Sequence, residues 1–351
     1  MLAIYTYKND VFREPEKEER AEFCSSSAKK NLDGLGLVAA LRGLGRDTII
    51  EKKFGDISSF NFSREVFNSG KWNDLSKIAR GLFINTKTGE IVARGYEKFF
   101  AHNERAFNSD RFLKDNIQYP VQVYEKYNGF LGIIGIFEGK LLFCTKSIVG
   151  GEYGSYMKSI FDEVVKPSMN WTEDFLAEWL DKNKKCLVFE VVDPKNDPHI
   201  VKYSKPKMVL LDVIDRTREF KTLPYRELKT FAESAGFACK EKCNIINDFE
   251  TLKNEMEKLE SSDEPQREGC VFVDASGYHV KVKTRWYKDW KYLRGFIPKI
   301  ANRRGYSTSG LRTPEMNYFI DFLKKKDPEE LMAKSLVQLR DEFFEESKGG
   351  I

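Results

Sequence analysis

The stretch Val123–Phe130 constrains this chain most, because an apolar, strand-like run ends at a lysine and a second run begins just after a glycine. The second run, Phe130–Phe137, has the pattern of a buried strand. A lysine amine is a nucleophile only when deprotonated, and its ordinary pKa is about 10.4. Partial burial and neighbouring cations favour the neutral amine, so Lys126 is a candidate nucleophile, and Gly129 permits close backbone approach to a ligand. The alternative is an exposed hairpin turn.

A further apolar run, Cys186–Val192, carries one carboxylate at Glu190. A strand that is buried on both faces should not hold a glutamate without a partner, because an unpaired buried charge is costly. Glu190 is therefore either half of a salt bridge at a strand end or a ligand to a ribose hydroxyl or a metal-bound water.

A hairpin is predicted from Gly269–Val273 and His279–Lys283. Side chains alternate along a strand, so Lys281 and Lys283 share one face, where like charges are costly unless an anion lies there. A phosphate that bridges both amines would satisfy them, and a solvated edge strand is the alternative. Glu268, just before the hairpin, is placed to hold a metal-bound water.

Upstream, Ile78–Ile84 and Glu90–Arg94 are predicted as the two strands of another hairpin. Arg80, Arg94 and Lys98 can converge there as a phosphate clamp, since arginine binds phosphate through its two-pronged guanidinium and lysine as a point charge. Simple solvation of these side chains at the surface is the alternative.

The two ends of the chain are less informative. Residues 1–75 hold no motif, and we expect only a charged helix at Glu16–Arg20 and a short apolar helix at Leu37–Leu44. After Trp286 the strand pattern stops and capped amphipathic helices follow. The segment Lys281–Arg304 interleaves basic and aromatic residues, which is typical of a nucleic-acid surface or of a seam between domains.

Composition sets wider limits. A chain of 351 residues suits two domains, and a net charge of +4 permits a local basic face without indicating nucleic-acid binding. No apolar run is long enough to span a membrane, and no signal-peptide pattern begins the chain. The six cysteines are scattered, and the Cys239–Cys243 spacing does not indicate a zinc site. We therefore expect reduced thiols and a cytoplasmic location.

The order of these features resembles that in the covalent nucleotidyltransferases, which are the polynucleotide ligases and mRNA capping enzymes. Within that superfamily the chain is most similar to ATP-dependent RNA ligases of the bacteriophage tRNA-repair type, the RNA ligase 1 family, with the adenylyltransferase domain of fungal tRNA ligases as a cousin. The blocks that carry the resemblance are Ala79–Phe83, Glu97–Phe100, Lys126–Gly129, Thr145–Lys146, Phe189–Pro194, Ile200–Tyr203, Glu268–Val271 and Lys281–Tyr287.

The resemblance implies an α+β fold whose core is the mixed, mainly antiparallel β-sheet nucleotidyltransferase (ATP-grasp-like ligase) domain. We expect this adenylyltransferase domain at residues 76–285 and a small all-α domain at residues 286–351. Residues 1–75 are expected to pack on the core or to lead into it. DNA ligases and capping enzymes carry an OB-fold after the last lysine motif, so the helical pattern there argues against both.

The resemblance also implies the chemistry. ATP adenylates Lys126, the AMP moves to the 5′-phosphate of an RNA such as a broken tRNA, and a 3′-hydroxyl displaces it. The co-substrate is ATP with Mg²⁺ or Mn²⁺, and the expected protein is a monomer outside membranes whose partner is an end-healing kinase or phosphatase. The implied catalytic residues are Lys126, Lys281 and Lys283, the nucleotide site comprises Arg80, Lys98, Phe100, Glu125, Gly129, Lys146, Glu190 and Val271, and the metal residues are Glu268 and Glu190.

The chain departs from the family pattern at two positions. Asn128 replaces an aspartate, which should be a mild change, and Phe130 replaces a small polar residue, which can alter how the pocket closes. Two other functions stay open: an adenylyltransferase with an acceptor other than RNA, and a non-catalytic relative that binds RNA or nucleotide.

Overall fold

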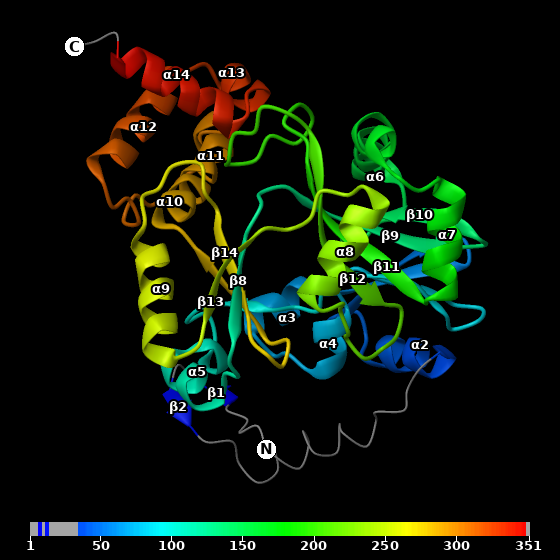
Figure 1. Cartoon of the computed structure of the whole chain (residues 1–351). Coiled ribbons are helices and arrows are strands. Elements are labelled where there is room, and N and C mark those ends of the chain that lie inside the picture. Colours follow the sequence, from blue (N-terminus) through cyan, green and yellow to red (C-terminus); the bar gives the residue numbers. More distant parts are fainter. Residues whose placement is uncertain (1–5, 9–10, 14–33, 349–351) are drawn as a thin grey trace.

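The computed structural model describes residues 6–8, 11–13 and 34–348, and these form β-sheets surrounded by helices, with a helical region at the C-terminal end (Figure 1). The helix predicted at Glu16–Arg20 lies outside the described residues. The short helix predicted at Leu37–Leu44 is confirmed as α2, Gly34–Gly43. The small pair of strands near the N-terminus is β1 (Thr6–Lys8) and β2 (Val11–Arg13).

The first large sheet joins strands from both sides of residue 75. Its order is β3-β4-β5-β6, with every pair antiparallel. The β3–β4 hairpin carries a sequence signal, because Gly55 and Asp56 form a turn between two β-rich runs. The strand predicted from Ile78 is wrong at its start, since Ile78 ends helix α4. The elements are β3 (Ile49–Phe54), β4 (Ile57–Phe62), α3 (Arg64–Ser69), α4 (Asp74–Ile78), β5 (Leu82–Asn85) and β6 (Ile91–Arg94).

The second sheet has the order β10-β9-β11-β12 and is also antiparallel. Helices α6, α7 and α8 cover it and share a buried cluster with it that includes Phe161, Leu187 and Phe231. The apolar runs that the sequence shows are therefore central strands. The elements are β9 (Phe130–Phe137), β10 (Lys140–Cys144), α6 (Gly151–Ile160), α7 (Glu173–Lys182), β11 (Lys185–Val192), β12 (Lys207–Asp215) and α8 (Tyr225–Ala235).

The third sheet has the order β13-β8-β14-β15-β7, and only the β15–β7 pair is parallel. Helices α5 and α9 pack against one face of this sheet. The predicted hairpin that carries Lys281 and Lys283 is confirmed as β14–β15. The elements are β7 (Phe100–Ala101), α5 (Asp110–Asn116), β8 (Val121–Glu125), β13 (Lys242–Ile246), α9 (Phe249–Ser261), β14 (Gly269–Val273) and β15 (His279–Lys283).

The described chain after β15 has helices as its regular secondary structure, with a loop at residues 302–313, and it lies at one end of the molecule (Figure 1). Tyr287 and Trp290 are buried in their core at 5% and 4% exposure, so these two aromatics pack internally, whereas Tyr292 of the same segment is exposed. The predicted α+β fold is confirmed, whereas the domain boundaries stay a prediction. The helices are α10 (Arg285–Arg294), α11 (Ile297–Ala301), α12 (Pro314–Lys325), α13 (Pro328–Ala333) and α14 (Leu336–Lys348).

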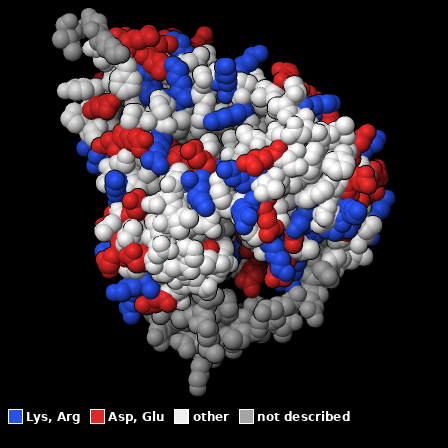
Figure 2. Space-filling model, viewed as in Figure 1, with Lys and Arg blue, Asp and Glu red and all other residues white. Residues whose placement is uncertain are grey.

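Surface charge is mixed on the face shown in Figure 2, in keeping with the small net charge of +4. Within the described residues, no helix combines the length and the apolar character needed to cross a membrane.

Candidate active site

Lys126 directly follows β8, and backbone pairing with the adjacent strand fixes its position. Its amide nitrogen donates to the Gly269 carbonyl at 2.9 Å. Its Nζ lies 3.0 Å from Glu268 Oε1, and Lys283 Nζ lies 2.8 Å from the same oxygen. Glu268 is only 3% exposed, so one buried carboxylate oxygen joins the two lysines.

These neighbours set the charge on Lys126. Burial lowers the pKa of the amine, but the carboxylates of Glu268 and Glu190 outweigh burial, and the pKa lies above its ordinary value. The expectation that burial and cations keep Lys126 neutral is therefore wrong, because acids dominate the surroundings of its amine. Burial raises the pKa of the Glu268 carboxyl, but Lys126 and Lys283 shift it below its usual value. The group is thus a buried acid that bridges two lysine amines.

Gly129 holds the second acid in place. Its amide nitrogen donates to Glu190 Oε1 at 2.9 Å. A Cβ atom at Gly129 would lie 2.1 Å from the carbonyl oxygen of Val191, so β9 and β11 approach each other more closely here than any side chain allows. The glycine is needed for contact between two strands, whereas the sequence suggested contact with a ligand. Burial raises the pKa of Glu190, and the charge of Lys126 opposes that shift.

A cationic group lies on the Lys281 side of the site. The amines of Lys98 and Lys281 each lie 3.2 Å from the Phe99 carbonyl oxygen. Burial lowers the pKa of Lys98 to about 8, and burial together with the charge of Lys98 lowers the pKa of Lys281 to about 7; Arg80 adds to both shifts. Glu104, at 3.7 Å from Lys98, is the acid paired with this group. Cations gathered with so little compensating charge are chemically suited to a polyanion.

Aromatic rings lie beneath these cations. Lys98 Nζ lies 3.8 Å from the ring centre of Phe100, and Lys146 Nζ lies 4.9 Å from that of Phe62. Trp72 joins the two rings, with its centre 5.2 Å from Phe100 and 4.8 Å from Phe62. The predicted residues Lys146 and Phe100 are thus brought together by Phe62 and Trp72, which lie in the part of the chain where the sequence shows no motif.

Two polar residues that the sequence analysis did not assign complete the surroundings of Glu268. Asn128 Nδ2 donates to Glu268 Oε2 at 2.8 Å and lies 3.3 Å from the hydroxyl of Tyr287. The sequence gives one signal for the role of Asn128, because this residue stands where the family pattern has an aspartate.

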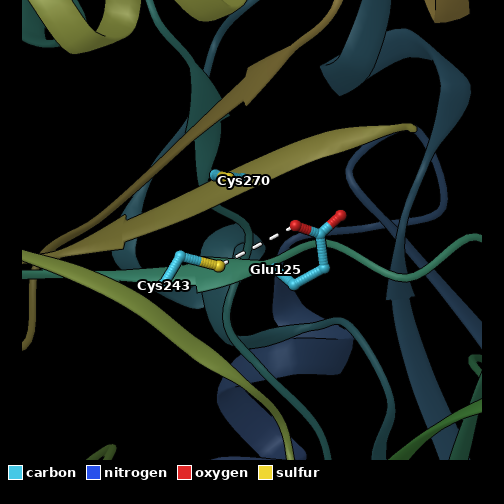
Figure 3. A group of neighbouring side chains, drawn as sticks. All are labelled: Glu125, Cys243 and Cys270. Atoms are coloured by element: carbon cyan, nitrogen blue, oxygen red, sulfur yellow. Dashed lines mark hydrogen bonds between the residues drawn. The ribbon is translucent and has the colours of Figure 1, made fainter. Parts of the chain in front are cut away.

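Val271 and Glu125 lie on opposite faces of their sheet. Val271 pairs in register with Lys281, whereas Glu125 pairs with Cys270, whose side chain points the other way. Arg267 Nη2 lies 3.1 Å from Glu125 Oε2 and 3.4 Å from Cys270 Sγ. Cys243, Cys270 and Glu125 place ligand atoms within 4.8 Å of one another (Figure 3), but Arg267 already supplies the positive charge there. The structure therefore separates the Glu125 side chain from the lysines.

Arg94 does not join the phosphate clamp that the sequence suggested. It is 1% exposed, and its Nη1 donates to the carbonyl oxygens of Thr217 and Arg218. Its Nη2 lies 3.1 Å from Glu97. That expectation is wrong because backbone carbonyls and an acid already occupy the guanidinium.

Comparisons with known proteins identify the family of the chain. The sequence model of a family described as RNA ligase matches residues 78–287, which is more than half of the chain. The chain belongs to the RNA ligase family. The matched span contains Arg80, Lys98, Lys126, Glu268 and Lys283, whereas Phe62 and Trp72 lie before it.

Individual members resemble only parts of the chain. The tRNA ligase of Candida albicans is 29% identical over 184 residues, which cover 45% of this chain and 22% of that protein. The tRNA ligase 1 of Schizosaccharomyces pombe is 26% identical over 321 residues, which cover 82% of this chain and 41% of that protein. The chain thus spans less than half the length of these relatives. An archaeal ATP-dependent RNA ligase has a similar fold, with a TM-score of 0.53 at 12% identity over 94% of this chain and 83% of that one.

Replacing Gly129 by alanine tests the contact between β9 and β11. The added methyl group must displace Val191 and break the Gly129–Glu190 hydrogen bond, so we expect the free energy of unfolding to fall by about 2 kcal/mol. Urea unfolding measures this. Gly154→Ala is the matched control, because a Cβ there meets no atom within 4 Å and alanine favours the helix. Equal stability of the two variants would contradict the assignment.

Replacing Lys281 by methionine tests whether burial of this amine beside other cations lowers the free energy of unfolding. The pKa of Lys281 is about 7 in the folded chain, below its unfolded value, so the folded chain bears the cost of the buried cation in full below pH 7. Above pH 7 that cost shrinks. Lys281→Met should therefore raise the free energy of unfolding by on the order of 1 kcal/mol at pH 6 and by less at pH 9.

Thermal unfolding at the two pH values measures this difference. The exposed Lys258 on α9 provides a control, since Lys258→Met should show no pH-dependent gain. A Lys281→Met variant that is less stable than the parent chain at pH 6 would show that the group is not repulsive.

Proposed function

We propose that this protein is an ATP-dependent RNA ligase that joins 5′-phosphate and 3′-hydroxyl RNA ends through an AMP carried first on Lys126 and then on the RNA. The observation that carries the proposal is the buried Glu268 oxygen shared by Lys126 and Lys283. It lies beside a separate group of cations, in a chain of the RNA ligase family.

In the first step, Lys126 Nζ forms a bond to the α-phosphorus of ATP, and the bond from that phosphorus to the bridging oxygen breaks as pyrophosphate leaves. The amine must lose a proton before it attacks, and the adjacent carboxylates hold that proton on. Arg80, Lys98 and Lys281 are placed to neutralise the phosphates, and Lys283 is placed to bind the α-phosphate. Such transfer depends mainly on positioning and on neutralisation of charge.

The acids fit a divalent cation. Mg²⁺ and Mn²⁺ prefer oxygen ligands, and the half-buried Glu190 and the buried Glu268 are carboxylates whose charge raises the pKa of Lys126. A bound divalent cation supplies positive charge beside these acids, which favours the neutral amine. Glu268 already accepts hydrogen bonds on both oxygens, so Glu190 is the better candidate ligand for the cation. Glu268 is better suited to position Lys126 and Lys283.

The names of the two relatives support RNA, and tRNA in particular, as the acceptor. In the last two steps the 5′-phosphate of the RNA displaces Lys126 from the AMP phosphorus, and a 3′-hydroxyl then attacks the activated 5′-phosphate and releases AMP. Such ends require a kinase or phosphatase to prepare them, so we propose an end-healing partner. We also propose a cytoplasmic monomer; the described cysteines are free thiols, as a reducing compartment requires.

Intact-mass measurement after incubation with ATP and Mg²⁺ tests the lysyl-AMP step. The parent chain should gain the mass of one AMP, and Lys126→Ala should gain none. Lys283→Ala should also gain none although circular dichroism shows an intact fold, because the α-phosphate loses its cation. Lys258→Ala on α9 is the control and should match the parent chain.

The second half of the experiment offers the adenylated protein a 5′-phosphorylated RNA, the same sequence as DNA, or no acceptor. Transfer of AMP to RNA alone supports the ligase. An adduct that no RNA discharges would indicate another acceptor. A folded chain, free of bound AMP, that forms no adduct would contradict the proposal and point to a non-catalytic relative.

A further inference from the structure

Arg340 on α14 is a buried charge in the helical C-terminal region. It is 1% exposed, and its guanidinium carbon lies 5.1 and 5.2 Å from the ring centres of Trp286 and Trp290. Burial lowers its pKa, and among the described residues no acceptor reaches its Nη2. An apolar side chain of similar size would fill this space without that cost. Helix packing therefore does not explain why a charged residue occupies this position.

The strongest contact of Arg340 is with a backbone carbonyl in the loop after β11. Its Nη1 donates to the oxygen of Ile200 at 2.8 Å. The amide nitrogens of Ile200 and Val201 both donate, at 3.0 Å each, to Oδ1 of Asn128. One fully buried residue, Ile200, is thus held by Arg340 through its carbonyl and by Asn128 through its amide.

Asn128 connects this loop to the acid of the active site. Its oxygen faces two N–H donors and its nitrogen faces the Glu268 carboxylate, so the amide group fits in one orientation only. The amide thereby fixes Oε2 of Glu268, and the other oxygen of that carboxylate holds Lys126 and Lys283. An unbroken series of hydrogen bonds leads from α14 to the amine of Lys126.

We propose that Arg340 is a positioning residue for Lys126, acting through the Ile200 carbonyl, the Asn128 amide and the Glu268 carboxylate. The inference rests on the proposed function, because attack on the α-phosphorus is the step that needs a directed amine. Displacement of a reacting group by an ångström can slow a reaction by orders of magnitude. The helical C-terminal region would then contribute to adenylation, in addition to any part it has in holding RNA.

Arg340→Met tests this, because methionine fills most of the space between the two tryptophans but cannot donate to Ile200. We expect the rate of AMP attachment at saturating ATP to fall about tenfold. The ATP concentration that gives half the maximal rate should change less than about twofold, because Arg80, Lys98 and Lys281 are untouched. Single-turnover labelling over a range of ATP concentrations measures both values.

Lys334→Met is the matched control, since this lysine lies in the same helical region but pairs only with the surface acids Glu330 and Glu342 among the described residues. It should keep the parent rate. A purely structural role for Arg340 would lower the fraction of folded, AMP-accepting protein while leaving the rate of that fraction unchanged. That result, or a parent rate at saturating ATP, overturns the proposal.

A double-mutant cycle with Asn128→Ala tests whether the two residues act through one path. If they do, the combined variant should be no slower than the slower single variant. Losses that multiply would show separate effects and overturn the proposal. Should Arg340→Met fail to fold, Asn128→Ala is the remaining test. A tenfold lower rate of AMP attachment at saturating ATP supports the path, and a rate equal to that of the parent chain overturns it.

The outcomes separate this inference from the proposed function. A parent chain that forms no adduct overturns both. A parent chain that forms the adduct, together with an unimpaired Arg340→Met variant, overturns only the role of Arg340.

Discussion

The candidate site depends on the buried carboxylate of Glu268. A charge at this depth is tolerated only when its lone pairs are used, and here one oxygen accepts from Lys126 and Lys283 while the other accepts from Asn128. Sheet order makes this possible. Strands β8, β14 and β15 are antiparallel neighbours, so the end of β8, the start of β14 and the end of β15 meet at one edge. Residues far apart in the sequence thereby become partners of a single acid.

The site contains two neighbouring regions of opposite character. Around Lys126 the acids prevail, and the pKa of its amine is raised. Around Lys281 the cations prevail, and its pKa falls to about 7. The proposed substrate, a chain of phosphates next to a reacting phosphorus, suits this division, because the cations would take up its negative charge while Lys126 would attack the phosphorus. The folded chain bears the cost of the cationic region, since those amines are compensated only when negative charge is added.

Much of this arrangement could be predicted from the sequence where it depends on local pattern. Strand periodicity placed Lys281 and Lys283 on one face, and the apolar run around Glu190 identified a half-buried acid in a central strand. Properties that depend on tertiary partners could not be predicted. Arg94 has the same residue type and setting as Arg80 in the sequence, and only the position of the loop at Thr217 shows that its guanidinium is occupied. The sign of the Lys126 pKa shift likewise follows from acids that the chain brings in from β11 and from the residue before β14.

The asparagine at position 128 shows why such partners matter. An aspartate, as the family pattern leads one to expect, would set a second carboxylate against Glu268, which requires a cation or a shared proton between them. Asparagine supplies an N–H donor in place of that cation, and its oxygen is used by Ile200 and Val201. The substitution therefore suits a chain in which protein contacts alone hold Glu268, and Asn128 is itself held by the loop after β11 and by Tyr287. Since Arg340 secures the same loop, the helices at the C-terminal end and the lysine motif form one connected unit, although the sequence pattern places them in separate domains.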